Sequence, residues 1–500
     1  MQYTRDTLLA PGCHALPLKA YPMLELHPDS PIPLVNQIID GLRERIDDQT
    51  LKPGAKVPSI RAFAATYSVS TFTVVEAYDR LVAQGLLVSR GNAGFFVNRA
   101  VNELLEQHAH RPDTPRPSFN SEWYLQQIFE TRQLPYKPGC GWLPNDWMYE
   151  DGLRRGMRQV AGSPLELSGY GDPMGLPELR ALTAQNLQQE LSIVANPTQL
   201  LLTHGASQAL DLAVRTLVRP GDVVLVDDPG YPNLMSILRF QGATLVGVPR
   251  TPAGYDLDQL ERLLDQYRPT VFFTQPHLHS PTCSRTPLAQ LHRLLQLASQ
   301  HGFRLVENNL YADMMAEPQP CLASLDHLQQ VVYVGSYSKS ISPNVRVGYL
   351  LANAESIQQL LRLKMRSGLT TSQVMERVVY AAVIDGRWRK HLKRLRQRLA
   401  DAHRVVGQHL HRLGFELFVE SDEGMYIWTR HPDLSDSAAL LDDALEHGIM
   451  LGPGQLFMVD AQASGWMRFN VAFSTEAAMW GLFEQVLARH VRSGALPAKA

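Results

Sequence analysis

The sequence predicts a multidomain protein with a small helical domain closed by a β-hairpin, a larger α/β domain and a small α+β part at the C-terminus. Three observations predict this fold class. The chain has 500 residues, enough for about two to four domains. Apolar residues recur at helical spacing over residues 34–46, and from residue 200 short β-rich runs alternate with helix-length segments.

Composition places the chain among ordinary globular proteins. Apolar residues make up 45% of it, and 47 Lys and Arg balance 49 Asp and Glu for a net charge of −2. This composition excludes collagen-like, mucin-like and wholly disordered classes. Because the overall charge is near zero, it argues neither for nor against a nucleic-acid partner.

The cysteines and the apolar runs bear on the cellular compartment. Cys13, Cys140, Cys283 and Cys321 lie far apart and form no pair at metal-ligand spacing, so we expect reduced thiols and no metal site. The sequence contains neither a signal-like apolar region near its start nor an uninterrupted apolar run of about 18 residues. These features predict a cytoplasmic protein with no membrane partner.

The N-terminal part divides into an irregular leader, residues 1–30, and a domain over residues 31–99. Leu34, Ile38, Leu42 and Ile46 form the apolar stripe of a first helix. A second helix begins after Ser59 and a third after Ser70, since each serine can cap a helix N-terminus. Residues 86–90 and 95–97 flank a Gly-Asn-Ala-Gly turn and predict a hairpin. Three helices and a hairpin outline a winged helix-turn-helix.

A Pro-rich linker over residues 100–118 leads to the larger domain, residues 119–500. Its large part, about 165–385, is expected to hold a mainly parallel sheet covered by helices. The expected strands are residues 200–203, 223–226, 244–248, 271–274, 304–306, 331–334 and 347–351. The basic segment 387–412 predicts a long helix whose leucines pack inward, an interpretation we favour over nucleic-acid binding. Residues 415–429, 449–451 and 467–473 predict a small α+β part, about 386–495.

The N-terminal domain closely resembles the DNA-binding domain of GntR-type bacterial transcription regulators. The similarity includes LKPG at residues 51–54, VPSIR at 57–61, VSTFTV at 69–74 and the hairpin. In that family the third helix enters the major groove of double-stranded DNA. The resemblance implies DNA contacts from Ser59, Arg61, Ser70, Thr71, Thr73, Arg90 and Gly94.

The sequence leaves open how three residues of this domain contribute to DNA binding. Many relatives carry an arginine after the serine that opens the third helix, where this chain has Thr71. Phe72 either contacts a thymine methyl group or packs inward, and the sequence does not decide between them. Arg61 either forms a surface ion pair or contacts a phosphate, and its match to the family motif favours the phosphate.

A lysine-centred segment carries the chemistry of the larger domain. Lys339 lies between two β-rich runs, with Ser336 and Ser338 before it and Arg346 seven residues after it. A lysine that forms a Schiff base with an aldehyde cofactor must be neutral, which requires burial or neighbouring positive charge. The guanidinium of Arg346 and the two hydroxyls suit a phosphate group.

This segment resembles the pyridoxal phosphate (PLP) lysine motif of fold-type I aminotransferases, and further matches follow in chain order over residues 135–490. The resemblance implies a PLP-dependent transferase fold with Lys339 as the Schiff-base residue. It places the cofactor phosphate on Ala206, Ser207, Ser336, Ser338 and Arg346, with Tyr170 from a second subunit, and the cofactor ring against Tyr231, Ser280, Asn308 and Tyr311. Arg468 would bind an α-carboxylate. A GntR domain joined to this domain is the architecture of the MocR subfamily.

The sequence departs from working aminotransferases at the partner of the pyridine nitrogen. An aspartate there keeps the nitrogen protonated, so that the ring accepts electrons. This chain has Asn308, whose neutral amide cannot stabilise a pyridinium ion. Ser280 replaces the usual asparagine of the NPTG motif, and Cys283 replaces its glycine.

The chain keeps the residues that the resemblance assigns to PLP binding, but it lacks the aspartate charge at the pyridine nitrogen. This combination favours a sensor over a catalyst. We expect a homodimeric DNA-binding regulator that uses PLP to sense an amine, an amino acid or PLP itself. The alternative is a catalytically active aminotransferase that carries a DNA-binding module. A third reading is a regulator that no longer binds the cofactor.

Overall fold

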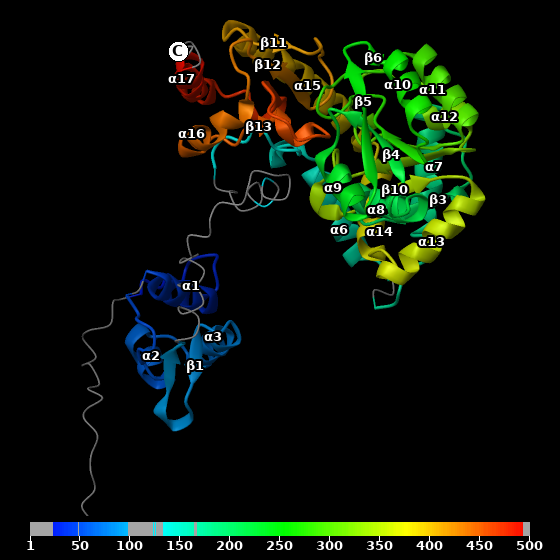
Figure 1. The fold of residues 1–500 in the computed structure, drawn as a ribbon. Helices are drawn as coiled ribbons and strands as arrows, with labels where there is room; N and C mark the ends of the chain where they lie inside the picture. The colour runs from blue at the N-terminus through cyan, green and yellow to red at the C-terminus, as the bar shows by residue number, and fades with distance from the viewer. Residues whose placement is uncertain are drawn as a thin grey trace, which may run out of the picture. The chain divides into compact units, whose positions relative to one another are not determined.

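A computed structural model describes residues 24–98 except Gln49, Tyr124 and Gln126, residues 134–164, and residues 168–493. The chain divides into two compact units, residues 1–117 and 118–500 (Figure 1). Residues 1–23 of the predicted leader, and the predicted linker 100–118, lie outside the described residues. Leu24, at the end of that leader, is buried in the core of the first unit, and its backbone N–H donates to the Tyr67 hydroxyl at 3.1 Å.

The first unit is the predicted three helices and hairpin. Its elements are α1 (Leu34–Asp47), α2 (Ile60–Tyr67), α3 (Thr71–Ala83), β1 (Leu87–Ser89), η1 (Gly91–Ala93) and β2 (Phe95–Val97). The two predicted caps are confirmed, because Ser59 Oγ accepts from Ala62 N at 3.2 Å and Ser70 Oγ accepts from Thr73 N at 3.0 Å. The apolar stripe of α1 packs on α3 to form the core.

The second unit is built on an eight-stranded sheet in the order β3-β10-β9-β8-β7-β4-β5-β6. The strands are β3 (Leu200–Thr203), β4 (Val223–Asp228), β5 (Thr244–Thr251), β6 (Gly254–Tyr255), β7 (Val271–Thr274), β8 (Arg304–Asn308), β9 (Val331–Ser336) and β10 (Gly348–Leu351). The four neighbouring pairs from β9 to β5 are parallel. Strand β10 is antiparallel to both of its neighbours, so the sheet is largely but not wholly parallel.

Helices cover both faces of this sheet (Figure 1). Helices α10, α11 and α12 lie on one side, and α8, α9 and α13 lie on the other. The helices are α6 (Glu150–Ala161), α7 (Pro177–Leu191), α8 (Gly205–Leu217), α9 (Pro232–Phe240), α10 (Leu257–Gln266), α11 (Leu288–His301), α12 (Leu322–Asp326), α13 (Ala354–Gly368) and α14 (Gln373–Ile384). No helix in the described part of the chain is long and apolar enough to cross a membrane.

The C-terminal part is the predicted small α+β region. Helix α15 (Arg387–Arg412) spans the predicted residues and buries its leucines. A four-stranded antiparallel sheet follows, in the order β11-β12-β14-β13, with α16 (Leu441–Glu446) and α17 (Ala477–Ser493). Its strands are β11 (Glu416–Leu417), β12 (Tyr426–Arg430), β13 (Gly452–Pro453) and β14 (Trp466–Asn470).

The predicted strands of this region need correction. The run 415–429 is divided, because residues 418–425 leave the sheet and Gly424 adopts a left-handed φ of 77°. The prediction of a strand at 449–451 is wrong. Met450 exchanges backbone hydrogen bonds with Tyr136 and Gly139, and the strand begins only at Gly452. The run 467–473 is strand only to Asn470, after which a short 3-10 helix follows.

The carboxyl ends of parallel strands meet at one edge of the large sheet, where ligands bind in open α/β sheets. Asp227, Thr274 and Asn308 lie at the ends of β4, β7 and β8, and Ser336 ends β9. Since β3 and β9 both run antiparallel to β10, the end of β3 and the start of α8 meet the same edge. The topology therefore brings the ends of these strands and the start of α8, with the candidate PLP residues that they carry, to one edge of the sheet.

Candidate functional site

Lys339 follows β9 at the centre of this edge. Its Nζ donates to the carbonyl oxygen of Gly141 at 2.6 Å and lies 5.8 Å from the centre of the Tyr311 ring. Burial, followed by the positive charge of Arg468, lowers the pKa of Lys339 to about 8. The neutral fraction of this amine near neutral pH is therefore larger than that of an exposed lysine, and bond formation with an aldehyde requires the neutral amine.

Arg468 on β14 is buried beside the lysine. Its guanidinium donates to the carbonyl oxygen of Gly139 at 2.6 Å and lies 4.4 Å from the Tyr426 ring centre and 4.6 Å from that of Phe457. Arg468 Nε is buried with no hydrogen-bond partner among the described residues. A desolvated guanidinium with an unused N–H suits a carboxylate.

The phenols of Tyr311 and Tyr426 are 3.0 Å apart and share a hydrogen bond. Burial raises the pKa of both phenols, so both stay protonated at neutral pH. Tyr311 follows β8 of the large sheet, whereas Tyr426 belongs to β12 of the small one. The pair therefore joins the two parts of the second unit at the candidate site.

The predicted phosphate end combines Arg346 with the start of α8. Arg346 Nη2 donates to the carbonyl oxygen of His204 at 3.0 Å, and a Cβ atom on Gly205 would lie 2.8 Å from that nitrogen. Gly205 has a φ of 70°, so both conformation and space favour glycine there. The first-turn N–H groups of a helix have no acceptor within the helix, and they favour an anion. This end holds a guanidinium against a helix N-terminus.

Two serines belong to the predicted phosphate end. Ser336 Oγ donates to the Val347 carbonyl oxygen at 3.3 Å and accepts from Ser338 N at 3.1 Å. Ser338 Oγ is buried, and no partner for it lies in the part of the chain that the structure describes. Ser207 is exposed on the first turn of α8, and Ala206 is buried beside it.

The predicted ring end is a small cavity that Tyr231, Ser280 and Asn308 line together. Asn308 is buried at the end of β8, and its Oδ1 has no hydrogen-bond partner within the described ranges. Asp227 and His279, which were not among the predicted site residues, line the same cavity. Ser280 N donates a long hydrogen bond of 3.4 Å to Gln275 Oε1.

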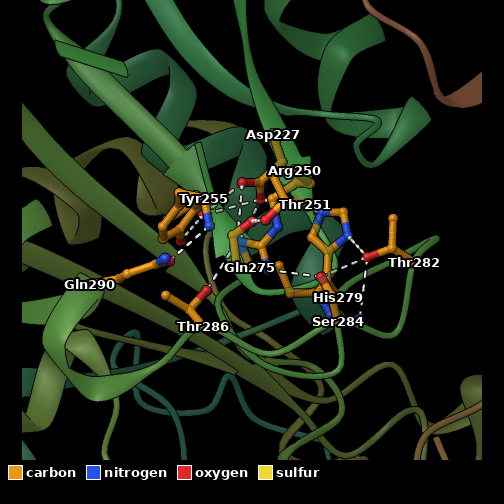
Figure 2. A network of polar contacts seen from close by, with 12 residues as sticks. Asp227, Arg250, Thr251, Tyr255, Gln275, His279, Thr282, Ser284, Thr286 and Gln290 are labelled. Atoms are coloured by element: carbon orange, nitrogen blue, oxygen red, sulfur yellow. Dashed lines mark hydrogen bonds and ion pairs between the residues drawn. The ribbon is translucent and has the colours of Figure 1, made fainter. Parts of the chain in front are cut away.

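Asp227 belongs to a buried polar network (Figure 2), which shares Gln275 and His279 with the lining of this cavity. Burial raises the pKa of Asp227, but the hydrogen bond from His279 and the charge of Arg250 lower it below the usual value overall. The carboxylate lies 3.4 Å from His279 Nε2 and 3.9 Å from Arg250 Nη1, and it accepts from Gln275 N at 2.8 Å. Burial lowers the pKa of His279. The buried negative charge is thus balanced by Arg250.

Arg250 is completely buried and fixes the loop that carries His279. Its two terminal nitrogens donate to Thr286 Oγ1 and Ser284 Oγ, each at 3.1 Å. Thr282 Oγ1 lies 2.8 Å from both His279 Nδ1 and Ser284 Oγ. The hydrogen bonds drawn in Figure 2 thus tie residues of the segment 275–286 to Asp227 and Arg250.

The residues present fit PLP at this edge. Buried polar groups normally find partners, so three buried atoms without one point to a missing ligand. Ser338 Oγ lies at the phosphate end, Asn308 Oδ1 at the ring end and Arg468 Nε beside the lysine. The three atoms belong to residues that the sequence assigns to the phosphate, the ring and the carboxylate, respectively.

Tyr170 is not brought into this group. It is 83% exposed and lines a separate hollow with Arg377 and residues 370–374. The sequence predicted that it reaches a second subunit, and its exposure leaves it free for such a contact.

The predicted DNA-binding residues lie around the starts of α2 and α3 and on the hairpin. Arg61, Thr71 and Arg90 are exposed. Arg61 has no ion-pair partner among residues 24–98 as described, and Arg90 lies 4.9 Å from the Phe96 ring centre. Ser59 and Ser70 cap the helices, and Thr73 Oγ1 lies 2.7 Å from Ser70 Oγ. Gly94 has a φ of 98° in the turn.

The structure decides between the two alternatives for Phe72. Its side chain is 75% exposed at the start of α3, so the inward-packing alternative is wrong. A large apolar side chain exposed at the end of a helix that reads bases is suited to a thymine methyl group.

Several residues of the site were not predicted from the sequence, including His279 of the ring-end cavity. Gly139 and Gly141 act through carbonyl oxygens, and a backbone acceptor leaves no side-chain signal. Tyr426 reaches the site through the pairing of β12 with β14, a contact between distant segments. Asp227 precedes the quoted Tyr231 in the run DDPGYPN, and its position at a strand end is the signal that could have identified it.

Comparison with known families agrees with both units. Residues 148–485 match the family of class I and II aminotransferases, and residues 34–97 match the gntR family of bacterial regulatory proteins. An uncharacterized HTH-type transcriptional regulator of Escherichia coli, YdcR, is 27% identical over 90% of this chain and 96% of its own. The probable rhizopine catabolism regulatory protein MocR of Rhizobium meliloti is 25% identical over 86% of this chain and 88% of its own.

A solved structure shares the fold of the second unit. The α-aminoadipate aminotransferase LysN of Thermus thermophilus, complexed with N-(5'-phosphopyridoxyl)-L-leucine, is 23% identical and superposes with a TM-score of 0.67. The alignment covers 77% of this chain and 99% of that one. The second unit therefore has the fold of PLP-dependent aminotransferases.

Proposed function

This chain belongs to the family of class I and II aminotransferases, and we propose that it uses its aminotransferase-like domain as the PLP-dependent sensor of a MocR-type transcription regulator. The matches to the two relatives described above cover 90% and 86% of this chain, and both relatives are named as regulators. The effector would be an amine, an amino acid or PLP itself. The protein would act as a cytoplasmic homodimer on double-stranded DNA.

The observation that carries the proposal is the neutral amide of Asn308 at the ring end of the cavity. A carboxylate there would stabilise a protonated pyridine, whereas an amide can only hydrogen-bond to the nitrogen. Asp227 does not replace that carboxylate, because its charge is balanced by Arg250 and it accepts bonds from residues 274 and 275. The cavity therefore favours binding over electron withdrawal.

The chain supplies a complete set of groups to hold PLP. Lys339 would hold the aldehyde carbon, Arg346 and the first turn of α8 the phosphate, and Tyr231 and Asn308 the ring. When bound, PLP supplies an aldehyde that condenses with amines and a ring that withdraws electrons. Gly141 orients the Lys339 amine, and Arg468 lowers its proton affinity.

Arg468 also selects the effector. It would bind a carboxylate once its bond to Gly139 is exchanged, so amino acids should bind more tightly than simple amines. The Tyr311 phenol beside Lys339 stays protonated and can donate a hydrogen bond at the reacting nitrogen. None of these roles requires removal of a proton from an α-carbon.

Regulation requires that the two ligand states of the aminotransferase-like domain prefer different arrangements of the two units. A ligand shifts only an equilibrium whose states it binds unequally. Tyr170, exposed on the second unit, would reach the phosphate of the partner subunit's cofactor and make PLP occupancy depend on the dimer.

The full-length protein tests the proposal. PLP should bind with a visible absorption band, and borohydride reduction followed by peptide mass spectrometry should locate it on Lys339. Adding amino acids should change both the spectrum and the affinity for the chain's own promoter region, with little turnover. Rapid repeated transamination would favour the enzyme alternative, and failure to bind PLP would favour a regulator without cofactor.

A further inference from the structure

A second hollow lies in the aminotransferase-like unit, outside the PLP site. It has a volume of about 680 Å³ and lies between residues 145–151 and the first half of α15. Small-molecule sites typically have volumes of about 300–1,000 Å³. The hollow is therefore large enough for a metabolite.

One stripe of α15 lines this hollow with positive charge. Arg387, Lys390, Arg394 and Arg398 recur at spacings of three and four residues and thus share one helix face. Like charges at these spacings destabilise a helix, so the stripe has a cost that folding alone does not explain.

The charges of the stripe are only partly balanced. Arg398 donates to Asp146 Oδ2 at 2.7 Å, and Arg387 lies 4.0 Å from Asp385. Lys390 and Arg394 are exposed, and neither has an ion-pair partner among the residues that the structure describes. Two cations thus remain available to an anion within one hollow.

The opposite wall carries three acidic groups and Arg155, whose guanidinium is paired with Asp385 at 3.1 Å. Asp146, Glu150 and Asp151 face the same hollow. Carboxylates repel the continuous phosphate backbone of a nucleic acid, but they accept hydrogen bonds from hydroxyl or amino groups of a small ligand. The mixed lining favours a compact molecule that carries both a phosphate and such donors.

The inner wall of the hollow contacts the segment that carries Lys339. His391 Nε2 is 3.1 Å from the Ser340 carbonyl oxygen, and Tyr149 N donates to the Ile341 carbonyl oxygen at 3.1 Å. The rings of Tyr149 and His391 pack with centroids 4.8 Å apart. A ligand in this hollow would therefore lie close to the backbone of Ser340 and Ile341, the two residues that follow Lys339.

We propose that this hollow is a second ligand site, which binds a phosphorylated small molecule bearing hydroxyl or amino groups through Lys390 and Arg394. The site stands independently of the sensor function proposed above, because none of its lining residues belongs to the PLP site.

Inorganic pyrophosphate is the probe for the test, and calorimetry on the full-length protein at low salt is the measurement. The double variant K390Q/R394Q should weaken binding by about tenfold or more, since each cation contributes a charge-assisted bond. The matched variant R389Q/K393Q removes the same charge from exposed positions of α15 outside the hollow, and it should change affinity less than about twofold.

Three results would overturn the proposal. The first is equal weakening in both double variants, which would indicate general attraction to a basic helix. The second is loss of pyrophosphate binding on saturation with PLP, which would place the probe at the cofactor phosphate. The third is displacement of the probe by a random DNA duplex that binds through Lys390 and Arg394. This result would make the basic face of α15 a nucleic-acid surface. Unchanged thermal unfolding of K390Q/R394Q verifies its fold.

Discussion

Lys339 Nζ donates a 2.6 Å hydrogen bond to the carbonyl oxygen of Gly141, and Arg468 donates one of equal length to Gly139 in the same segment. Residues 139–141 thus hold both the amine of Lys339 and the guanidinium of Arg468, whose charge lowers the pKa of that amine. Both bonds must be exchanged when ligands arrive, so the segment couples cofactor attachment to carboxylate binding.

The first prediction concerns the pH dependence of PLP attachment. Because only the neutral amine reacts, attachment should rise with pH around the Lys339 pKa of about 8. Arg468→Gln removes a positive charge that lowers this pKa, so the midpoint should move to higher pH. Stopped-flow absorbance after mixing with PLP measures it. Arg430→Gln, an exposed arginine on β12, is the control, and an unchanged midpoint in R468Q would contradict the assignment.

The second prediction concerns the electron-sink position. Asn308→Asp should increase single-turnover conversion of bound PLP to its pyridoxamine form by about tenfold or more, since a carboxylate stabilises the protonated ring. Asp227→Asn removes the other acid at this cavity, and because it leaves the buried Arg250 without its counter-charge, thermal unfolding of the variant is measured alongside the rate. A larger loss in D227N than gain in N308D would show that Asp227 supplies the charge.

The sequence predicted those parts that depend on local pattern. Residues 200–203, 271–274 and 387–412 fold as predicted, because β-rich runs between turns and a long apolar stripe specify strand and helix directly. The strand expected at 449–451 was wrong because its backbone bonds go to residues 136–139, more than 300 positions away. Tyr426 and the carbonyls of Gly139 and Gly141 were missed for the same reason, since only tertiary contacts bring them to Lys339.

The third prediction concerns base recognition. Phe72→Ala should weaken binding to the promoter region by about tenfold without changing the affinity for random DNA, since an apolar contact to a base carries sequence information. Fluorescence anisotropy with the two duplexes measures the difference. Phe240→Ala, which changes a phenylalanine of the second unit that is 92% exposed, is the control. Equal losses on both duplexes would exclude a base contact.

The fourth prediction concerns phosphate contact. Arg61→Ala should weaken promoter and random DNA alike and reduce the salt dependence of the association constant by about one unit of slope. Titrations at several salt concentrations give that slope. Arg43→Ala, on α1 beside Asp40, should leave it unchanged. A loss confined to the promoter would assign Arg61 to a base instead.

The fifth prediction concerns Glu307, which is fully buried on β8 and accepts backbone bonds from Leu322 and Ala323. Burial raises its pKa from 4.5 to about 7. The folded state therefore binds a proton that the unfolded state releases, and the free energy of unfolding should fall by up to about 3 kcal/mol between pH 4.5 and 7.

Glu307→Gln cannot titrate, so the difference in unfolding free energy between wild type and variant should change over that pH window and become constant above it. Urea unfolding at several pH values measures the slope. The exposed Glu476→Gln should retain the wild-type slope. Parallel curves for wild type and E307Q would contradict the raised pKa.

The link between Tyr311 and Tyr426 has a consequence for acid sensing. The two phenols bridge the large and small sheets, and Arg468 moves with the small one. If the sheets separate, Lys339 loses the neighbouring cation and binds its proton more tightly. By thermodynamic reciprocity, a proton on Lys339 favours separation of the sheets. Acidification should therefore favour separation of the two sheets, and an amino acid carboxylate bound at Arg468 should oppose it.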